Sequence, residues 1–363
     1  MKARDPVQWR VLDTGLRRAA ENFAIDRALL ESHQAGTSPH TLRFLRFQAS
    51  ALLGFHQNVE QELNLDYIRA HDIEIQRRLT GGGAIYFAPE HLGWELFLDK
   101  AVLGTADMTT IARRICEAAA AGLSSLGVDA RFRPRNDIEV EGRKISGTGG
   151  AFDGDSILYQ GTVLVAFDVE RMLRVLRIPA EKLSDKAIAS ARERVVSLQD
   201  LLGSPPPLDT VRQALANAFG EAFGARYEVA SELNSAEQAL YVEALAEIDC
   251  DDWVYQRDRP VTEAPMREAI HRCRGGTLRC GVVLDQPRQR LNQVWITGDF
   301  FAAPGRVVVD LESALRNTAL AELERNVSRF FDQYPVQMLM LEPADLVAAI
   351  RSAVASAPEQ VHG

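Results

Sequence analysis

The sequence predicts an α+β fold in two parts. Its 363 residues are more than one ordinary domain usually holds, so we expect a large domain and a smaller one. Strand-like and helix-like segments follow one another without the regular alternation that a doubly wound parallel sheet requires. Mixed or antiparallel sheets flanked by helices fit this pattern. We place the first domain at residues 1–248, a linker at 249–262 and a smaller α+β domain at 263–363.

Apolar periodicity and turn residues place the elements of the first domain. Residues 16–30 carry apolar side chains at helical spacing, and the alanine-rich segment 108–126 predicts a helix that ends at Gly127. Residues 137–147 alternate around Glu141–Gly142, a dipeptide that favours a hairpin turn. Further strands are expected at 41–55, where a bend separates two of them, and at 84–87, 94–98 and 156–167. Two more helices are expected at 210–223 and 236–247.

A second unit is expected to begin near Pro260. The runs "GTLRCGVVLD" (276–285) and "LNQVWITGDFF" (291–301) predict strands. Residues 309–331 predict one helix, and residues 343–354 predict another with Pro343 in its first turn.

Composition and charge exclude several classes of protein. The formal net charge of -9 argues against general nucleic-acid binding, which usually leaves a basic footprint. The four cysteines show no CxxC and no zinc spacing, which indicates reduced thiols. The N-terminal residues lack the apolar core of a signal peptide, and no apolar run approaches the length of a membrane span. We therefore expect a soluble, cytoplasmic protein that binds neither nucleic acid nor membranes. Separately, we expect a monomer.

The stretch "RRLTGGGAIYF" (Arg77–Phe87) is the first candidate site. A turn needs one or two glycines, so three in a row indicate that something approaches the backbone closely or that a Cβ is forbidden. The Rossmann and P-loop signatures are both absent from this stretch. Arg77 and Arg78 beside bare amide groups favour a phosphate or a carboxylate. The apolar residues after the glycines suit a hydrophobic group joined to that anion.

The segment 131–150 is the second candidate. Its three early arginines, at positions 131, 133 and 135, fit a solvated hairpin. Lys144 follows the hairpin turn and precedes the glycine-rich "ISGTGG", where its ammonium group can reach an anionic oxygen. Asn136 and Asp137 can orient a nucleotide, or hold a metal ion through the carboxylate. Asp137 can equally cap a turn.

Six segments, taken in order, resemble the lipoate–protein ligase A family over most of residues 16–203. Each motif alone is modestly specific, but six in this order are highly specific. They are "ENFAIDRALL" (21–30), "LLGFHQN" (52–58), "RRLTGGGAIY" (77–86), "RNDIEVEGRKISGTGG" (135–150), "YQGTVLVAFD" (159–168) and "KAIASARERVVSLQDLL" (186–202). The last segment has, by itself, only the periodicity of an amphipathic helix. The chain beyond Pro260 is similar, more weakly, to the accessory C-terminal domain of these ligases, with "ITGDFF" (296–301) as its most telling piece.

The resemblance implies a class II synthetase-like lipoate/biotin ligase domain and an ATP-dependent reaction. Lipoate would be activated to lipoyl-AMP with release of pyrophosphate, and the lipoyl group would pass to a lysine of an acceptor protein. Lys144 would be the catalytic residue that bridges the adenylate phosphate and the lipoyl carbonyl. A magnesium ion would assist the triphosphate, with Asp137 as its candidate ligand.

The resemblance also implies a set of residues that bind ATP or the lipoyl-adenylate. They are Arg78, Gly81, Gly82, Gly83, Ala84, Ile85, Tyr86, Asn136, Asp137, Gly147, Thr148, Gly161, Thr162, Lys186, Ser190 and Val195. The loop 186–195 would close over the adenine side. The acceptor would be a lipoyl domain or a carrier similar to the H protein of glycine cleavage, and Arg131, Arg133 and Arg135 would steer an acidic acceptor.

Two positions depart from the family, and alternatives remain open. Gln160 stands where a histidine commonly precedes the Gly-Thr pair, and Phe87–Ala88 replaces a His-Asp pair. An octanoyltransferase of the same fold takes a thioester donor without ATP and often uses a cysteine near the lysine's strand, but residues 131–150 contain none. A non-catalytic protein that binds lipoyl carriers is the other alternative. The sequence decides neither the acceptor nor the choice between lipoate and octanoate.

Overall fold

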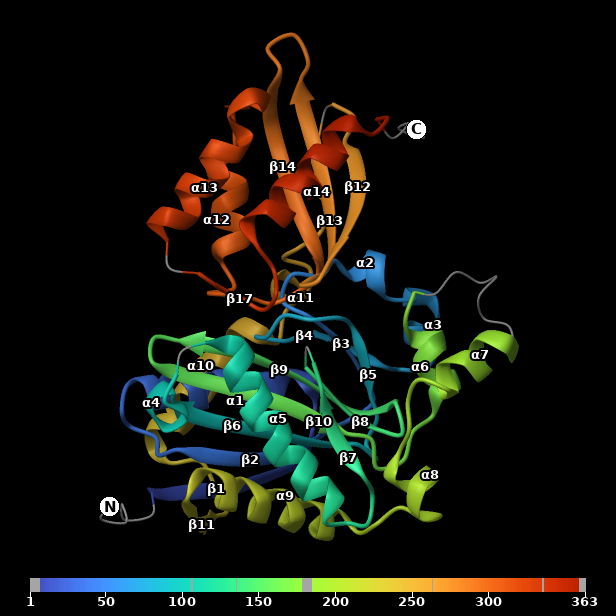
Figure 1. Ribbon diagram of the computed structural model, residues 1–363, viewed down its shortest axis with the longest axis vertical. Coiled ribbons are helices and arrows are strands. Elements are labelled where there is room, and N and C mark those ends of the chain that lie inside the picture. Colours follow the sequence, from blue (N-terminus) through green and yellow to red (C-terminus); the bar gives the residue numbers. More distant parts are fainter. Residues whose placement is uncertain are drawn as a thin grey trace.

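The computed structural model describes residues 7–105, 107–134, 136–177, 185–262, 264–334 and 336–358. Figure 1 shows two stacked parts, a larger N-terminal part built on a wide sheet and a C-terminal part with its own sheet. Each part has its own hydrophobic core. Within the described ranges, no helix is long and apolar enough to cross a membrane. The predicted α+β fold is confirmed.

The N-terminal part contains most of the strands and helices. Its strands are β1 (Val7–Arg17), β2 (Thr41–Phe47), β3 (Ser50–Leu53), β4 (Glu74–Arg77), β5 (Ile85–Phe87), β6 (Leu92–Asp99), β7 (Ala130–Arg133), β8 (Asp137–Val140), β9 (Arg143–Asp153), β10 (Ser156–Val163) and β11 (Ala225–Ala230). Its helices are α1 (Ala19–Gln34), α2 (Val59–Glu62), α3 (Leu65–Ala70), α4 (Lys100–Leu103), α5 (Met108–Ser124), α6 (Val169–Val175), α7 (Asp185–Arg192), α8 (Leu198–Leu202), α9 (Leu208–Phe223), α10 (Ser235–Ile248) and α11 (Asp251–Val254).

The large sheet separates two layers of helices. Its strand order is β11-β1-β2-β6-β10-β9-β8-β7, with β1 parallel to both of its neighbours and the central pairs antiparallel. Trp94 of β6 packs on Phe219 of α9, with ring centroids 5.1 Å apart. Phe97 of the same strand packs with residues of α1. Because neighbouring residues of a strand point to opposite faces, Glu95 shares the α1 face with Phe97.

A small sheet carries the glycine-rich loop. Its order is β4-β3-β5, and residues 78–84 connect β4 to β5. The expected bend after β2 is present. It also takes the chain from one sheet to another, because β2 belongs to the large sheet and β3 to the small one. The loop therefore belongs to the small sheet, which the chain enters directly from β2 of the large sheet.

The C-terminal part is a four-stranded antiparallel sheet with helices packed on it. Its strands are β12 (Arg267–Cys273), β13 (Gly276–Asp285), β14 (Arg290–Asp299) and β16 (Thr318–Ala319), and β15 (Ala302–Ala303) pairs with β17 (Gln337–Met338). Its helices are α12 (Val307–Ala314), the short 3-10 helix η2 (Leu320–Glu322), α13 (Leu323–Gln333) and α14 (Pro343–Ala355). Figure 1 shows α12, α13 and α14 in red around β13 and β14.

Several polar contacts join the two parts. The amide of Gly82 donates to the carbonyl of Phe300 at 2.9 Å, and the amide of Gly298 donates to the carbonyl of His56 at 3.1 Å. Arg257, in the proposed linker, donates to both carboxylate oxygens of Glu312 in α12. The end of β14 is thereby held against the glycine-rich loop.

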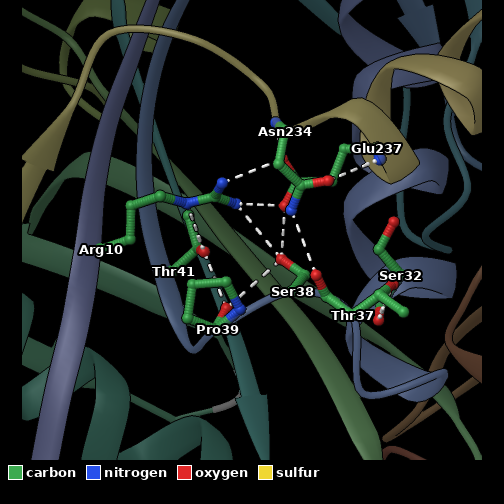
Figure 2. A network of polar contacts seen from close by, with 8 residues as sticks. All are labelled: Arg10, Ser32, Thr37, Ser38, Pro39, Thr41, Asn234 and Glu237. Atoms are coloured by element: carbon green, nitrogen blue, oxygen red, sulfur yellow. Dashed lines mark hydrogen bonds and ion pairs between the residues drawn. The ribbon is translucent and has the colours of Figure 1, made fainter.

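A buried network of polar groups fastens α10 to the edge of the large sheet (Figure 2). Arg10 of β1 donates to both carboxylate oxygens of Glu237, at 2.9 and 2.6 Å. Ser38 donates to the same carboxylate at 2.6 Å, and Asn234 caps the helix through the amide of Glu237. Arg10 also donates to Thr41 at 3.1 Å. Because the charges of Arg10 and Glu237 are paired and hydrogen-bonded, the network can stay buried.

Some elements differ from expectation. The predicted helix at 309–331 is wrong, because Asn317 has a positive φ of 61° and the chain forms β16 and η2 between α12 and α13. The strands β1, β4, β7, β11 and β12 were not predicted. The hairpin at Glu141–Gly142 is confirmed, and both turn residues have the positive φ values (52° and 77°) that this type of two-residue turn needs.

Candidate active site

A cavity of about 370 Å³ lies where the large sheet, the small sheet and the C-terminal part meet. Its polar lining includes Asn136, Asp137 and Lys144 from the β8–β9 hairpin. Its apolar lining includes a contiguous cluster from α1, β2, β3 and β5, made of Phe23, Leu45, Phe47, Leu52 and Phe87. A ligand that fills the cavity therefore needs both an apolar portion and a polar or charged one.

The three glycines of the loop are explained by the C-terminal part. A Cβ on Gly81 would lie 2.3 Å from the carbonyl oxygen of Phe300, and one on Gly82 would lie 2.8 Å from the ring of Phe301. Gly82 also has a φ of +95°, which residues with a Cβ rarely adopt. The group that approaches the loop closely is thus a segment of this same chain, and the remaining loop amides line the cavity beside it.

Arg77 does not face an anion, which corrects the sequence interpretation. Its side chain is fully buried and donates to five carbonyl groups, those of residues 54, 55 and 57 and of residues 253 and 254. Burial and, secondarily, Arg257 lower its pKa to about 9. Arg77 therefore ties the small sheet to α11 inside the proposed linker, and its role is structural.

Arg78 does line the cavity, but it is already engaged. Its guanidinium donates to the carbonyls of Leu52, Gly81 and Gly83 at 2.9, 3.1 and 2.9 Å. Burial lowers its pKa to about 10, while the nearby carboxylate of Asp299 acts in the opposite direction. Its clearest function in this conformation is to hold the glycine-rich loop in shape.

Lys144 and Asp137 form an ion pair at the polar end of the cavity. The Nζ of Lys144 lies 2.7 Å from Oδ1 of Asp137, and Arg133 donates to Oδ2 at 2.7 Å. Burial raises the pKa of this carboxyl, but Lys144 and Arg133 outweigh burial, so the pKa of Asp137 is lowered overall. A Cβ on Gly147 would lie 2.8 Å from Nζ, so that glycine leaves room for the lysine side chain.

Thr148 and Asn136 are fixed by a buried network behind the cavity wall. Asn136 and Thr148 exchange hydrogen bonds in both directions. The Thr148 hydroxyl also lies 2.9 Å from the Tyr159 hydroxyl and 3.3 Å from the thiol of Cys116. Burial raises the pKa of Cys116 to about 11, and this thiol is not among the groups that line the cavity.

In the segment 186–195, which is expected to close over the adenine, only Val195 lines the cavity among the residues whose side chains the structure describes. Residues 194–196 pair with Lys144, whose amide donates to the carbonyl of Arg194 at 2.8 Å. Val195 lines the cavity. Ser190, on the predicted helix α7, does not line it. The side chain of Lys186 lies outside the described part of the structure.

The remaining expected residues gather around the same cavity. Each of the following lines it: Gly83, Ala84, Ile85, Tyr86, Gly161 and Thr162. Tyr86 is buried in the small sheet, and Thr162 lies within hydrogen-bond distance of both backbone groups of Gly147. These positions support the predicted set as binding residues, which we retain as a proposal.

Sequence reasoning missed many of the lining residues, including four with polar or aromatic side chains. Asp299 and Phe301 come from the C-terminal part, and Glu95 and His91 come from β6 and the turn before it. The three consecutive glycines were a usable signal for Asp299 and Phe301, because they indicated that another group approaches the loop closely. Gln160, identified only as a departure from the family, also lines the cavity, as does Phe87, which packs on Phe47 with ring centroids 4.5 Å apart.

The described residues do not fit a resident metal ion. No three histidine, cysteine or carboxylate side chains come together anywhere in the described ranges. Both oxygens of Asp137 already accept from cations, Lys144 and Arg133. The prediction that Asp137 binds magnesium therefore has no support from this geometry.

The chain matches the model of the lipoyl protein ligase A/B catalytic domain over residues 18–220. Octanoyltransferase LipM of Kyrpidia tusciae is 31% identical, over 69% of this chain and 99% of that protein. Lipoate-protein ligase A subunit 1 of Thermoplasma acidophilum is 34% identical, over 55% of this chain and 78% of that protein.

Solved structures show the same likeness. The bipartite lipoate protein ligase of Thermoplasma acidophilum, solved in a study with its E2 lipoyl domain, has a TM-score of 0.64 at 30% identity, over 70% of this chain and 99% of that one. Lipoate-protein ligase A bound with ATP has a TM-score of 0.60 at 28% identity, over 69% and 98%. P. falciparum LipL1 in complex with lipoate shares the fold at 17% identity, with a TM-score of 0.71 over 95% of this chain and 99% of that one.

The matched region contains α1, the small sheet, strands β2 and β6–β10 of the large sheet, and the hairpin that carries Lys144. With a family model that covers more than half of the chain, and relatives matched over nearly their whole length, the protein belongs to the lipoyl protein ligase A/B catalytic-domain family of enzymes.

Proposed function

We propose that the protein is an ATP-dependent lipoate–protein ligase. It would activate lipoate to lipoyl-AMP and then transfer the lipoyl group to a lysine of an acceptor protein. The observation that carries this proposal is the composition of the cavity. It joins an apolar wall to Lys144, Asn136 and the glycine-rich loop, and its described lining contains no cysteine.

In the first step, an oxygen of the lipoate carboxylate attacks the α-phosphorus of ATP. A new oxygen–phosphorus bond forms, the bond to the β-phosphate breaks, and pyrophosphate leaves. The protein needs to supply little covalent chemistry, because the reaction depends on charge stabilisation. Lys144 can move from Asp137 to the phosphate oxygens as a point charge, and the loop amides can donate beside it.

In the second step, the neutral amine of an acceptor lysine attacks the lipoyl carbonyl. The amide bond forms, the bond to AMP breaks, and the proton of the amine passes to solvent. Lys144 would stabilise the oxyanion that forms on the carbonyl. Phe301, which packs over Gly82 and Gly149, would exclude water from the adenylate. Magnesium would arrive with the triphosphate as part of the substrate, since the described residues offer no preformed site.

Octanoyl transfer from a thioester donor is the second candidate, because relatives such as LipM of Kyrpidia tusciae carry that name. An acyl-cysteine route needs a thiol that reaches the cavity. Cys116 lies behind Thr148, and its raised pKa keeps it protonated, so it is a poor nucleophile. We therefore propose Cys116→Ala as a discriminating variant, which should retain the activity of a ligase.

The deciding experiment is pyrophosphate release with lipoate, ATP and magnesium, in the absence of an acceptor. Wild type should release pyrophosphate only when lipoate is present, and Lys144→Ala should lose this activity. Arg143→Ala is the matched control, because Arg143 is the neighbouring cation and pairs with Glu141 on the surface. If well-folded wild type releases no pyrophosphate but transfers octanoyl from a thioester, the transferase assignment replaces the ligase.

A further inference from the structure

The apolar end of the cavity has a polar floor. Arg43, Glu95 and Gln160 lie opposite one another on the neighbouring strands β2, β6 and β10. Because side chains at paired positions share a face, all three face the α1 side of the large sheet. Glu95 and Gln160 line the cavity among the apolar residues of α1, β2 and β5.

Glu95 belongs to a buried cluster that also contains Asp26. Arg43 donates to Asp26 at 2.5 Å and to Glu95 at 2.9 Å, and all three side chains are at most 3% exposed. Burial and then Glu95 raise the pKa of Asp26, while Arg43 acts in the opposite direction. Arg43 is hydrogen-bonded to both carboxyl groups, so the floor is polar but its charged groups are paired inside the protein.

Gln160 has unused hydrogen-bonding capacity. Its Oε1 is buried and has no hydrogen-bond partner among the described residues. Gly149 lies opposite it on β9, where a Cβ would be 2.7 Å from the ring of Phe301, so the amide sits under the aromatic cover of the cavity. A buried acceptor without a donor is costly, which indicates that a ligand completes it.

The distance from Lys144 to Gln160 and Glu95 matches the length of the acyl chain. Thr162 contacts Gly147 beside Lys144, and Gln160 is two residues further along the same strand face, about 7 Å away. Glu95 is one strand beyond, about another 5 Å. An eight-carbon acyl chain whose carboxylate lies at Lys144 can therefore bring its far end to Gln160 and Glu95.

We propose that Gln160 and Glu95 recognise the sulfur-bearing end of the lipoyl group, so that the enzyme prefers lipoate to octanoate. This inference rests on the proposed function. Sulfur is polarisable and a weak hydrogen-bond acceptor for the Gln160 amide, and in the reduced dithiol form each S–H is a weak donor for Oε1. A saturated octanoyl tail offers neither, and a site built for hydrogen bonds rejects an analogue that lacks them.

The test is equilibrium binding of lipoate and of octanoate, measured by calorimetry without ATP, for wild type, Gln160→Leu and Glu95→Leu. Wild type should bind lipoate more tightly than octanoate. Gln160→Leu should lower the ratio of the two affinities about tenfold, or about 1.4 kcal/mol. Glu95→Leu leaves Arg43 and Asp26 as a one-to-one pair, so it should fold and lower the ratio in the same direction. Met172→Leu, an apolar change in the same cavity, should leave the ratio unchanged.

An unaltered ratio in Gln160→Leu, or an equal loss of both affinities, would overturn the inference while leaving the ligase assignment in place. Wild type that binds lipoate but releases no pyrophosphate with ATP would overturn only the ligase assignment, and the affinity ratio would still decide the inference. Wild type that binds neither acid would overturn both.

Discussion

Lys144 and Asp137 hold each other at 2.7 Å across the β8–β9 hairpin, and both face the cavity. The carboxylate of Asp137 holds the ammonium group of Lys144 at the cavity before substrate arrives. A phosphate that enters must compete with Asp137 for the ammonium group. The pair is therefore a positioning device for the charge that stabilises adenylation.

Asp137→Asn should show how much the activity depends on Asp137 holding Lys144 in position. The amide keeps the size of the side chain but removes the negative partner of Lys144 and of Arg133. We expect kcat for pyrophosphate release to fall about ten- to a hundredfold, because the lysine is no longer held in place. Stopped-time assays with lipoate and ATP measure this. An unchanged kcat would show that Lys144 is positioned by the substrate alone.

The contact between Gly149 and Phe301 offers a size-swap experiment. A Cβ on Gly149 would lie 2.7 Å from Cε1 of Phe301, so Gly149→Ala should displace the ring and lower both thermal stability and adenylation. Phe301→Ala should weaken adenylation through exposure of the cavity to water. The double variant should be more stable than the sum of the two single effects predicts. Additive effects would mean that the ring and the glycine do not meet in solution.

The chemistry of the site could be predicted from the sequence because much of it is local. The β8–β9 hairpin brings Asn136, Asp137 and Lys144 together through short-range pairing and a turn whose residues accept positive φ. What the sequence could not provide is the identity of distant neighbours. Arg77 resembles a ligand cation in the sequence, but its carbonyl partners at 253 and 254 lie far along the chain.

Non-local contacts also explain the missed elements. β1 and β11 pair in parallel although more than 200 residues separate them, and neither has a turn signal that would identify it. Residues 309–331 keep an apolar helical pattern through Asn317, where only the positive φ breaks the helix. The C-terminal residues of the cavity could be inferred only as an unknown neighbour of the glycines.

Acid should destabilise the protein through buried histidines. Burial lowers the pKa of His56 to about 3 and that of His91 to about 4, from an ordinary value of 6.5. Between these values the unfolded chain binds more protons, so this stability is present above pH 6.5 and is lost as pH falls. The pKa of His33 is lowered to about 4 in the same way, whereas the raised pKa values of Asp26 and Glu95 oppose the trend.

Each of these histidines contributes a loss of up to about 1.4 kcal/mol per pH unit, so we expect stability to fall between pH 6 and 5. Urea unfolding at several pH values measures the slope. His56→Asn should flatten it by about the same amount, whatever its effect on the absolute stability. A slope of the opposite sign would mean that the buried carboxyl groups dominate.

Glu237→Ala should destabilise the fold without touching the reaction. It leaves the guanidinium of Arg10 buried and without its main partner (Figure 2), which typically costs about 3–5 kcal/mol. Neither residue lines the cavity, so kcat for pyrophosphate release at a permissive temperature should stay at the wild-type value. Glu170→Ala, which removes a half-exposed ion pair with Arg174, is the control and should change stability far less. Equal effects of the two variants would contradict the assignment of Glu237 as a buried anchor.

Acceptor docking can be separated from chemistry by comparing two arginines of β7. Arg131 pairs with Asp129 on the surface, whereas Arg133 contacts Asp137, the partner of Lys144. Arg135 lies outside the described residues.

If an acidic lipoyl carrier docks at Arg131, Arg131→Glu should lower kcat/KM for the acceptor about two- to fivefold at low salt. The effect should be smaller at high salt, because salt screens electrostatic steering. Acceptor-free pyrophosphate release should be unchanged in Arg131→Glu but reduced in Arg133→Glu. A salt-independent effect of Arg131→Glu, or none at all, would place the acceptor elsewhere on the protein.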